Sequence, residues 1–161
     1  MSTRDFFIKR WEQELAAFGK VLRAVPDTGF AYRPHERSTA AGALAWQIAD
    51  EQAQLSDLLQ SGSVSFADRP KGPAKVADIV AVWDRATEDL RKRLQSTSDQ
   101  KWNEKATLKF GDNEWSDTME NMFWGYLLDM IHHRGQLSAY LRPMGVKVPA
   151  IYGPSADDSG S

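Results

Sequence analysis

The longest helical pattern in the chain is DTMENMFWGYLLDMIHHRGQLSAYLR, residues 117–142. Apolar and aromatic side chains recur in it at intervals of three and four residues, which places them on one face of a helix. Asp117 or Thr118 is suited to cap the start of this helix, and Pro143 ends it. The pattern therefore predicts a helix over about 117–142 whose buried face is formed by Met119, Met122, Tyr126, Met130, His133, Leu137 and Tyr140.

Three other segments carry the same periodicity. We expect helices over about 4–24, 39–61 and 75–96, each with its apolar side chains on one face. Residues 106–116 alternate around a turn at 111–113, which predicts a short β-hairpin before the last helix. Helices of this length cover their apolar faces by packing side by side. The sequence therefore predicts an all-α four-helix bundle over residues 1–145, with long crossover connections expected between the first and second helices and between the third and fourth.

The end of the chain has a different character. Residues 146–161 contain two prolines and close with DDSGS, residues 157–161, which offers no apolar side chain to bury. We expect an extended C-terminal arm with a disordered tail.

Composition excludes several classes of function. The chain has 161 residues, 20 basic and 22 acidic side chains, and no cysteine. Without cysteine there are no disulfides, thiolate metal sites or cysteine nucleophiles. The net charge of -2 gives no support to nucleic-acid binding. Charged residues interrupt every apolar stretch well before the roughly 20 residues that span a bilayer, and the N-terminus does not resemble a secretory signal. We therefore expect a cytoplasmic protein that binds neither nucleic acid nor membrane.

One pair of polar residues falls on the predicted buried face of the last helix. His133 lies on that face, and Asp129 precedes it by one turn, so the two side chains can converge on one atom. A carboxylate and an imidazole at this spacing are typical of half of a metal site. In the alternative interpretation, Asp129 holds a core histidine in one tautomer with no ion present. Arg134 is expected on the opposite, solvated side of this helix.

A second row of polar residues lies on the predicted helix over 39–61. Gln47, Glu51 and Gln54 recur at intervals of four and three residues, one strip over from the apolar face. Gln47 and Glu51 can reach the core or its rim. A solvated face is the alternative, and it suits Glu51 better than Gln47, which lies between Trp46 and Ile48.

The last helix and the segment after it resemble a known family. The run DMIHHRGQLSAYLRPMG, residues 129–145, and its continuation VKVPAIYGPSAD, residues 146–157, are similar to the DinB-like superfamily. A weaker similarity covers residues 44–50, and the order of predicted helices agrees over the whole chain. The resemblance implies a four-helix bundle of the DinB-like type that is commonly a homodimer. Many of its members bind a divalent metal through three histidines.

The resemblance also implies where the metal ligands lie, and this chain departs from the family pattern twice. Gln47 stands where the family has a histidine on the second helix, in LAWQI, residues 44–48. Asp129 replaces the first histidine of a His-x-x-x-His pair, whose second member is His133. The implied metal ligands are Gln47, Asp129 and His133, with Glu51 as a fourth. Fewer imidazoles favour manganese over zinc or nickel.

Two functions from different classes are consistent with the resemblance. In the first, the chain is a divalent-metal-binding enzyme, because relatives include metal-dependent hydrolases and transferases of low-molecular-weight thiols. Its substrate is then a small thiol or another small molecule, and its cofactor is zinc, nickel or manganese. In the second, the protein is a metal-free dimeric binding or structural protein with a degenerate site. No glycine-rich phosphate loop or catalytic Ser-His-Asp arrangement is present to suggest another chemistry.

Overall fold

The computed structural model describes residues 1–160, and residue 161 of the predicted tail lies outside them. Most described residues are helical. The helices are α1 (Thr3–Ala24), α2 (Ala41–Ser61), α3 (Val76–Ser96), α4 (Asp99–Trp102) and α5 (Met119–Leu141). The strands are β1 (Ser63–Ser65), β2 (Lys105–Phe110) and β3 (Asn113–Thr118). Each predicted long helix is present, and its bounds agree with the prediction to within about two residues.

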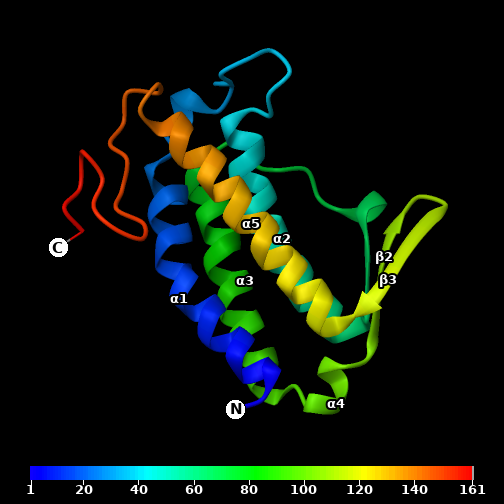
Figure 1. Cartoon of the computed structure of the whole chain (residues 1–161). Coiled ribbons are helices and arrows are strands. Elements are labelled where there is room, and N and C mark those ends of the chain that lie inside the picture. Colours follow the sequence, from blue (N-terminus) through cyan, green and yellow to red (C-terminus); the bar gives the residue numbers. More distant parts are fainter. Residues whose placement is uncertain (161) are drawn as a thin grey trace.

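The four long helices lie side by side (Figure 1). α2 packs against α3 and α5, and α1 packs against the same two helices, so α1 and α2 face each other across a diagonal. Their apolar faces meet in a core with fully buried aromatic and aliphatic side chains, among them Trp11, Phe18, Ile48, Leu55 and Leu90. α1 and α5 run in one direction and α2 and α3 in the other, so the neighbours α2 and α5 are antiparallel.

The connection that runs the length of the molecule joins α2 to α3. The sequence predicts crossovers between the first and second helices and between the third and fourth, but these pairs are joined at the same end of the bundle (Figure 1). α2 ends at one end of the helices and α3 begins at the other, where the Val76 backbone N–H donates to Asp27 Oδ1 at 2.7 Å. Residues 62–75 bridge that distance along the outside of α2 and α5 (Figure 1). This connection carries β1 and places Phe66 and Arg69 beside the middle of the bundle.

The all-α prediction is incomplete, because the structure contains a three-stranded sheet. β2 and β3 form the predicted antiparallel hairpin, with Leu108 opposite Trp115. β1 adds to it in parallel, with Val64 beside Leu108. The Ser-Val-Ser segment is too short to show a strand pattern, and Gly62 turns the chain into it with φ of +74°. The sheet extends from the bundle beside the N-terminal end of α5 (Figure 1).

The longest helix, α5, begins directly at the end of the hairpin. The Thr118 side chain accepts from the Asn121 backbone N–H, so Thr118 is the N-cap of α5. The preceding residues belong to β3, and no loop separates strand from helix. The hairpin is therefore held directly against the start of α5.

Arg134 corrects one expectation from the sequence, since it is 2% exposed and not on a solvated side. Its guanidinium donates to Glu14 Oε2 of α1 at 2.7 Å and to the Tyr152 hydroxyl at 2.5 Å. The same guanidinium lies over the rings of Phe18 and Tyr152. The helical pattern alone cannot reveal this environment, because the residues that neutralise and cover Arg134 come from distant parts of the chain.

The C-terminal arm packs against the bundle along its described length. Ala150 is buried, and Tyr152 reaches Glu14 on α1. The predicted disordered tail is folded back up to residue 160, because Asp157 accepts from Val148 N–H and Asp158 accepts from Ala150 N–H. The tail is held by hydrogen bonds from backbone N–H groups to these carboxylates and not by burial of apolar side chains. A prediction based on hydrophobic residues therefore does not detect it.

No helix among residues 1–160 is long and apolar enough to cross a membrane.

Candidate metal centre

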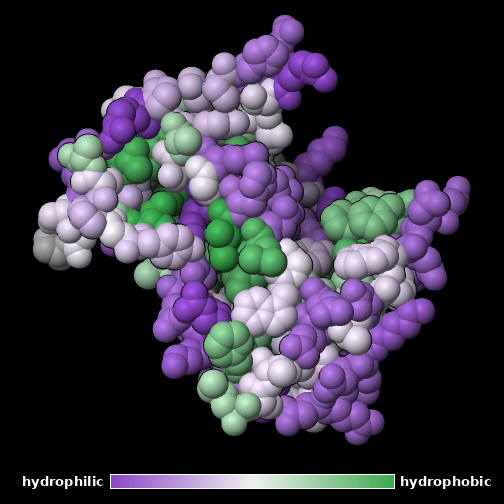
Figure 2. Space-filling view, viewed as in Figure 1, coloured by the Kyte–Doolittle hydropathy of each residue, from purple (hydrophilic) through white to green (hydrophobic). Residues whose placement is uncertain are grey.

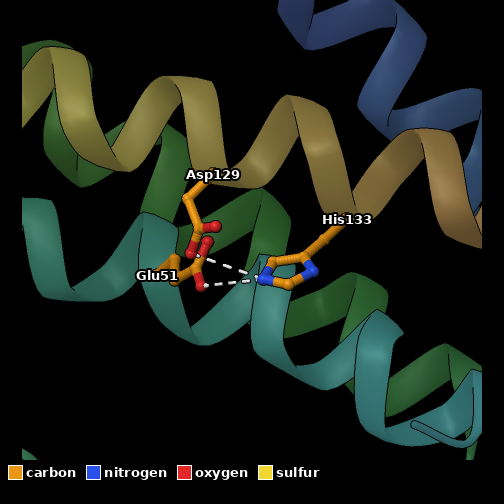
Figure 3. A group of neighbouring side chains, drawn as sticks. All are labelled: Glu51, Asp129 and His133. Carbon is orange, nitrogen blue, oxygen red and sulfur yellow. Dashed lines mark ion pairs between the residues drawn. The ribbon is translucent and has the colours of Figure 1, made fainter. Parts of the chain in front are cut away.

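Two antiparallel helices bring four polar side chains to one point. Gln47 and Glu51 are one turn apart on α2, and Asp129 and His133 are one turn apart on α5. Figure 3 shows Asp129 and His133 pointing from α5 toward Glu51 on α2. One ligand atom from each of Glu51, Asp129 and His133 lies within 4.8 Å of the other two. The three residues can therefore share one small cation.

The imidazole of His133 is at the centre of this group. Its Nε2 atom is 3.3 Å from Asp129 Oδ2 and 3.9 Å from Glu51 Oε1. The amide nitrogen of Gln47 is 2.7 Å from the same Nε2 and 2.9 Å from Glu51 Oε1. All four side chains thus meet at the edge of the imidazole ring that carries Nε2.

The other imidazole nitrogen selects the tautomer of His133. Nδ1 is 3.2 Å from Gln136 Oε1, an atom that can only accept a hydrogen bond. A proton on Nδ1 satisfies this contact and leaves the Nε2 lone pair directed at Glu51, Asp129 and Gln47. Metal-binding histidines are oriented in this way, with the second nitrogen donating to an oxygen.

Glu51 carries the unusual electrostatics of the group. It is only 5% exposed, and the pKa of its carboxyl is raised to about 8, chiefly by burial. The nearby Asp129 and Asp50 carboxylates contribute to this rise, while the hydrogen bond from Gln47 opposes it. The Oε2 atom of Glu51 is buried and has no hydrogen-bond partner among the described residues. A buried carboxylate oxygen without a partner is costly, and a bound cation or a proton removes that cost.

The residues present fit a divalent cation. Within residues 1–160, no Lys or Arg forms an ion pair with Glu51 or Asp129, so the two carboxylates lack a counter-charge of their own. Two carboxylates and one neutral imidazole form a donor set that suits divalent ions, with oxygen favouring manganese and imidazole favouring zinc or nickel. Asp129 is half exposed, which leaves one side of the group open to solvent.

Gln47 contacts Glu51 and His133 through its NH₂ group, which cannot bind a metal ion. Its amide NH₂ group donates to Glu51 and faces His133 Nε2, so this group lies where a shared ion would bind. Coordination by Gln47 requires the amide to present its oxygen in place of its nitrogen, because only the oxygen has a lone pair for a metal. In this geometry, the Gln47 amide therefore bridges Glu51 on its own helix and His133 on α5.

A cavity of about 400 Å³ opens beside Glu51 and Asp129. Its polar end is formed by Gln47, Glu51 and Asp129. Its larger, apolar wall comes from the 66–68 turn, the hairpin and α5, and consists of Phe66, Leu108, Trp115, Met122 and Tyr126. The carboxylates therefore border a space in which a small molecule can contact them.

A hydrogen-bonded chain connects the cavity to the crossover between α2 and α3. The Tyr126 hydroxyl donates to Gln54 Oε1 at 2.6 Å, and Gln54 Nε2 donates to Asp50 at 2.8 Å. Arg69 of the crossover pairs with Asp50 and with Asp57. Burial raises the pKa of the Tyr126 hydroxyl, which stays protonated and serves as a fixed donor. This series of hydrogen bonds fixes the wall of the cavity next to Glu51.

Comparison with known families identifies the group to which this architecture belongs. The model of the DinB family matches residues 1–160, almost the entire chain. The chain belongs to the DinB family. This confirms the resemblance drawn from the end of the sequence.

One relative matches this chain in sequence, and two solved DinB-like proteins share its fold. The chain is 26% identical over 164 residues to the uncharacterized protein YrdA of Bacillus subtilis (strain 168), and the match covers 97% of this chain and 92% of YrdA. The crystal structure of a DinB-like protein from Bacillus cereus ATCC 10987 superposes with a TM-score of 0.73 at 18% identity, covering 91% of this chain and 95% of that one. The DinB-like YjoA of Bacillus subtilis gives 0.71 at 17% identity, covering 90% and 96%.

The structure brings together the residues that the sequence singled out. Asp129 and His133 converge as their spacing predicts, and Gln47 and Glu51 lie opposite them. The solvated alternative for Glu51 is wrong, because Glu51 is buried while Gln47 is half-buried. Sequence reasoning missed the cavity, although the alternation around the predicted hairpin already places Leu108 and Phe110 on one face of a strand.

Proposed function

We propose that this DinB family protein binds one divalent metal ion through Glu51, Asp129 and His133. We further propose that it acts as a metal-dependent hydrolase or as a transferase of low-molecular-weight thiols. The observation that carries the proposal is the buried Glu51 Oε2 atom, which has no partner among the described residues and lies in the group that the His133 Nε2 lone pair faces. The ion is zinc, nickel or manganese, with the two carboxylates favouring manganese.

Each residue of the group has a distinct part in this proposal. When bound, a divalent ion supplies a Lewis acid that lowers the pKa of a coordinated water or thiol. Gln136 keeps the proton of His133 on Nδ1, so Nε2 stays available as a ligand. Glu51 holds the buried side of the site, and the half-exposed Asp129 holds the side that faces the cavity.

Metal analysis of protein purified without a nickel column tests the proposal. After incubation with zinc, nickel and manganese in turn and removal of free metal, we expect close to one ion per chain for at least one of them. Asp129→Asn should reduce the content below about a tenth of an ion per chain. Asp112→Asn, which removes the same charge at the exposed tip of the hairpin, should leave the content unchanged. Metal contents below a tenth in the wild type would remove the proposal.

A second candidate function is a metal-free binding protein, and one observation favours it. The Gln47 amide already donates to Glu51 and faces His133 Nε2, so most polar atoms of the group are satisfied without an ion. Thermal unfolding separates the two functions. A ligand at 100 times its dissociation constant stabilises a protein by about 2.7 kcal/mol, so a true metal site raises Tm on metal addition. The metal-free protein shows no such shift.

We also retain the homodimer as a proposal. Leu128 is 63% exposed on α5. This large apolar side chain is available for contact with a second copy of the chain. Light scattering during gel filtration should give twice the mass of 18.1 kDa, and the mass of a single chain would contradict the proposal.

A further inference from the structure

The cavity next to the candidate metal centre has a large apolar wall, and binding of a metal ion does not require such a wall. Leu108 and Trp115 are opposite each other across the hairpin, so both side chains lie on the sheet face that borders α5. Phe66 of the crossover stacks on Phe110 of β2, with ring centroids 4.6 Å apart and an angle of 13° between the rings. Two elements that are far apart in the sequence thus build one aromatic wall.

This wall leaves large apolar side chains in contact with solvent. Phe66 is 38% exposed, Phe110 46% and Trp115 50%. Apolar surface is visible over the 66–68 turn and the hairpin, to the side of the helices, in Figure 2. Exposed aromatic side chains that gather beside a cavity mark a binding site more often than aromatic side chains scattered singly over a surface.

The charges of the cavity restrict what can bind there. Its only charged lining residues are the acids Glu51 and Asp129, and no Lys, Arg or His of the described residues lines it. A ligand that carries a carboxylate or phosphate would therefore lie beside two acids with no cationic side chain to neutralise it. The two positive charges of a divalent ion would balance the negative charges of the two acids and leave none to neutralise an anionic ligand. The cavity volume of about 400 Å³ lies in the range of small-molecule sites.

We propose that this cavity binds a small molecule with an uncharged aromatic body, held by Phe66, Leu108, Trp115 and Met122. The polar end of the molecule points to Glu51 and Asp129. The proposal deepens the proposed function, because it names the chemical class of substrate that the same site would take. It excludes substrates and thiols whose body carries carboxylates.

A matched pair of probes tests the charge requirement without any metal. Phenylacetamide and phenylacetate have the same aromatic body and differ in one charge. We expect phenylacetamide to shift the methyl signal of ¹³C-labelled Met122 saturably in the metal-free protein, and phenylacetate to bind at least tenfold more weakly. Equal affinities, or tighter binding of phenylacetate, would overturn the proposal.

Two glycines of α5 offer a matched test of the location. A side chain added at Gly125 or at Gly135 would meet no atom within 4 Å, and both residues lie on exposed positions of the same helix. Gly125 lines the cavity and Gly135 does not. We expect Gly125→Leu to weaken phenylacetamide binding at least tenfold, measured by ligand-observed NMR, and Gly135→Leu to leave it within twofold of the wild type. Effects of similar size in both variants would contradict the location.

Trp115→Ala tests the aromatic wall at a residue that is half exposed and outside the buried core of the bundle. It should weaken phenylacetamide binding at least fivefold, whereas Leu128→Ala, which removes an exposed apolar side chain outside the cavity, should not. If Trp115→Ala instead converts a dimer to a monomer and leaves the probe affinity unchanged, the wall is a subunit interface and the proposal is wrong.

The metal analysis and the probe titrations test the metal site and the aromatic site independently. Probe binding by a chain that takes up no metal would remove the proposed function and leave the aromatic site standing. Metal uptake by a chain that does not discriminate between the two probes would remove the aromatic site alone.

Discussion

Two buried glutamates in this protein have opposite surroundings. Glu14 on α1 is 4% exposed and Glu51 on α2 is 5% exposed. Glu14 is 2.7 Å from the Arg134 guanidinium and also accepts from the Tyr152 hydroxyl, so its charge is neutralised within the chain. Glu51 faces another carboxylate and a neutral imidazole, and one of its oxygens has no partner among the described residues.

The two acids differ in whether the chain supplies a cation beside them. Arg134 and His133 are adjacent in sequence but lie on different faces of α5, and each meets one of the two glutamates. The Glu14 cluster contains its own cation and joins α1, α5 and the C-terminal arm. The Glu51 cluster, as far as residues 1–160 describe it, contains no arginine or lysine and adjoins a cavity.

The largest expected effect comes from breaking the neutralised cluster. Arg134→Met leaves Glu14 buried without its cation, which should lower the free energy of unfolding by about 3–5 kcal/mol. Urea denaturation measures this change. The double variant Glu14→Gln/Arg134→Met removes both charges and should recover most of the loss. A loss below about 1 kcal/mol in the single variant would show that Glu14 does not need Arg134.

The opposite cluster should make the metal-free protein sensitive to pH. The pKa of Glu51 is about 8 in the folded protein and near 4.5 in the unfolded chain, so the folded state binds the extra proton. This contribution to stability is complete below pH 4.5 and is lost as the pH rises through 8. It corresponds to a loss on the order of 3 kcal/mol between pH 5 and 8.

Glu51→Gln isolates this effect, since the amide keeps the shape of the side chain and does not titrate. Urea denaturation of both proteins in a chelator, from pH 5 to 8, should show a steeper fall for the wild type than for Glu51→Gln. Parallel curves would mean that Glu51 is not the uncompensated acid.

A smaller effect is expected from strengthening the metal donors. Gln47→His replaces an amide, whose NH₂ group now faces His133 and Glu51, with an imidazole that suits zinc better. We expect the affinity for zinc, measured by competition with a chromogenic chelator, to rise about tenfold, or roughly 1.4 kcal/mol. Gln54→His, further along α2 and bonded to Tyr126, is the control and should not raise it. An unchanged or weaker zinc affinity in Gln47→His would place the ion elsewhere.

The smallest effect concerns the face of α5 that carries neither cluster. Gly135 is in the interior of the helix with open space around its Cα, so Gly135→Ala should raise the free energy of unfolding by about 0.5–1 kcal/mol. Gly145 has φ of +81°, so Gly145→Ala should lower it. Thermal unfolding measures both. Destabilisation by Gly135→Ala would show that another group already fills the space around this Cα.

The helices, the hairpin and the convergence of Asp129 with His133 could be predicted from the sequence, because each depends on spacing within one segment. The burial of Glu51 and of Arg134 could not. A solvated row of polar residues and a buried one have the same periodicity, so the sequence does not show which of them is buried. Burial depends on distant residues that cover the row. Arg134 is covered by Phe18, Glu14 and Tyr152, and Glu51 is covered by α5. β1 was missed for the same reason, since its partner strand lies about 40 residues away.

Anomalous scattering from crystals grown with manganese would show whether Glu51, Asp129 and His133 share an ion. Data collected on both sides of the manganese edge show where the ion lies, independently of any activity. We expect one anomalous peak between the Glu51 carboxylate, the Asp129 carboxylate and His133 Nε2, with ligand distances of about 2.0–2.3 Å. A manganese-saturated crystal without that peak, in which the Gln47 amide still bridges Glu51 and His133, would contradict the proposed metal site.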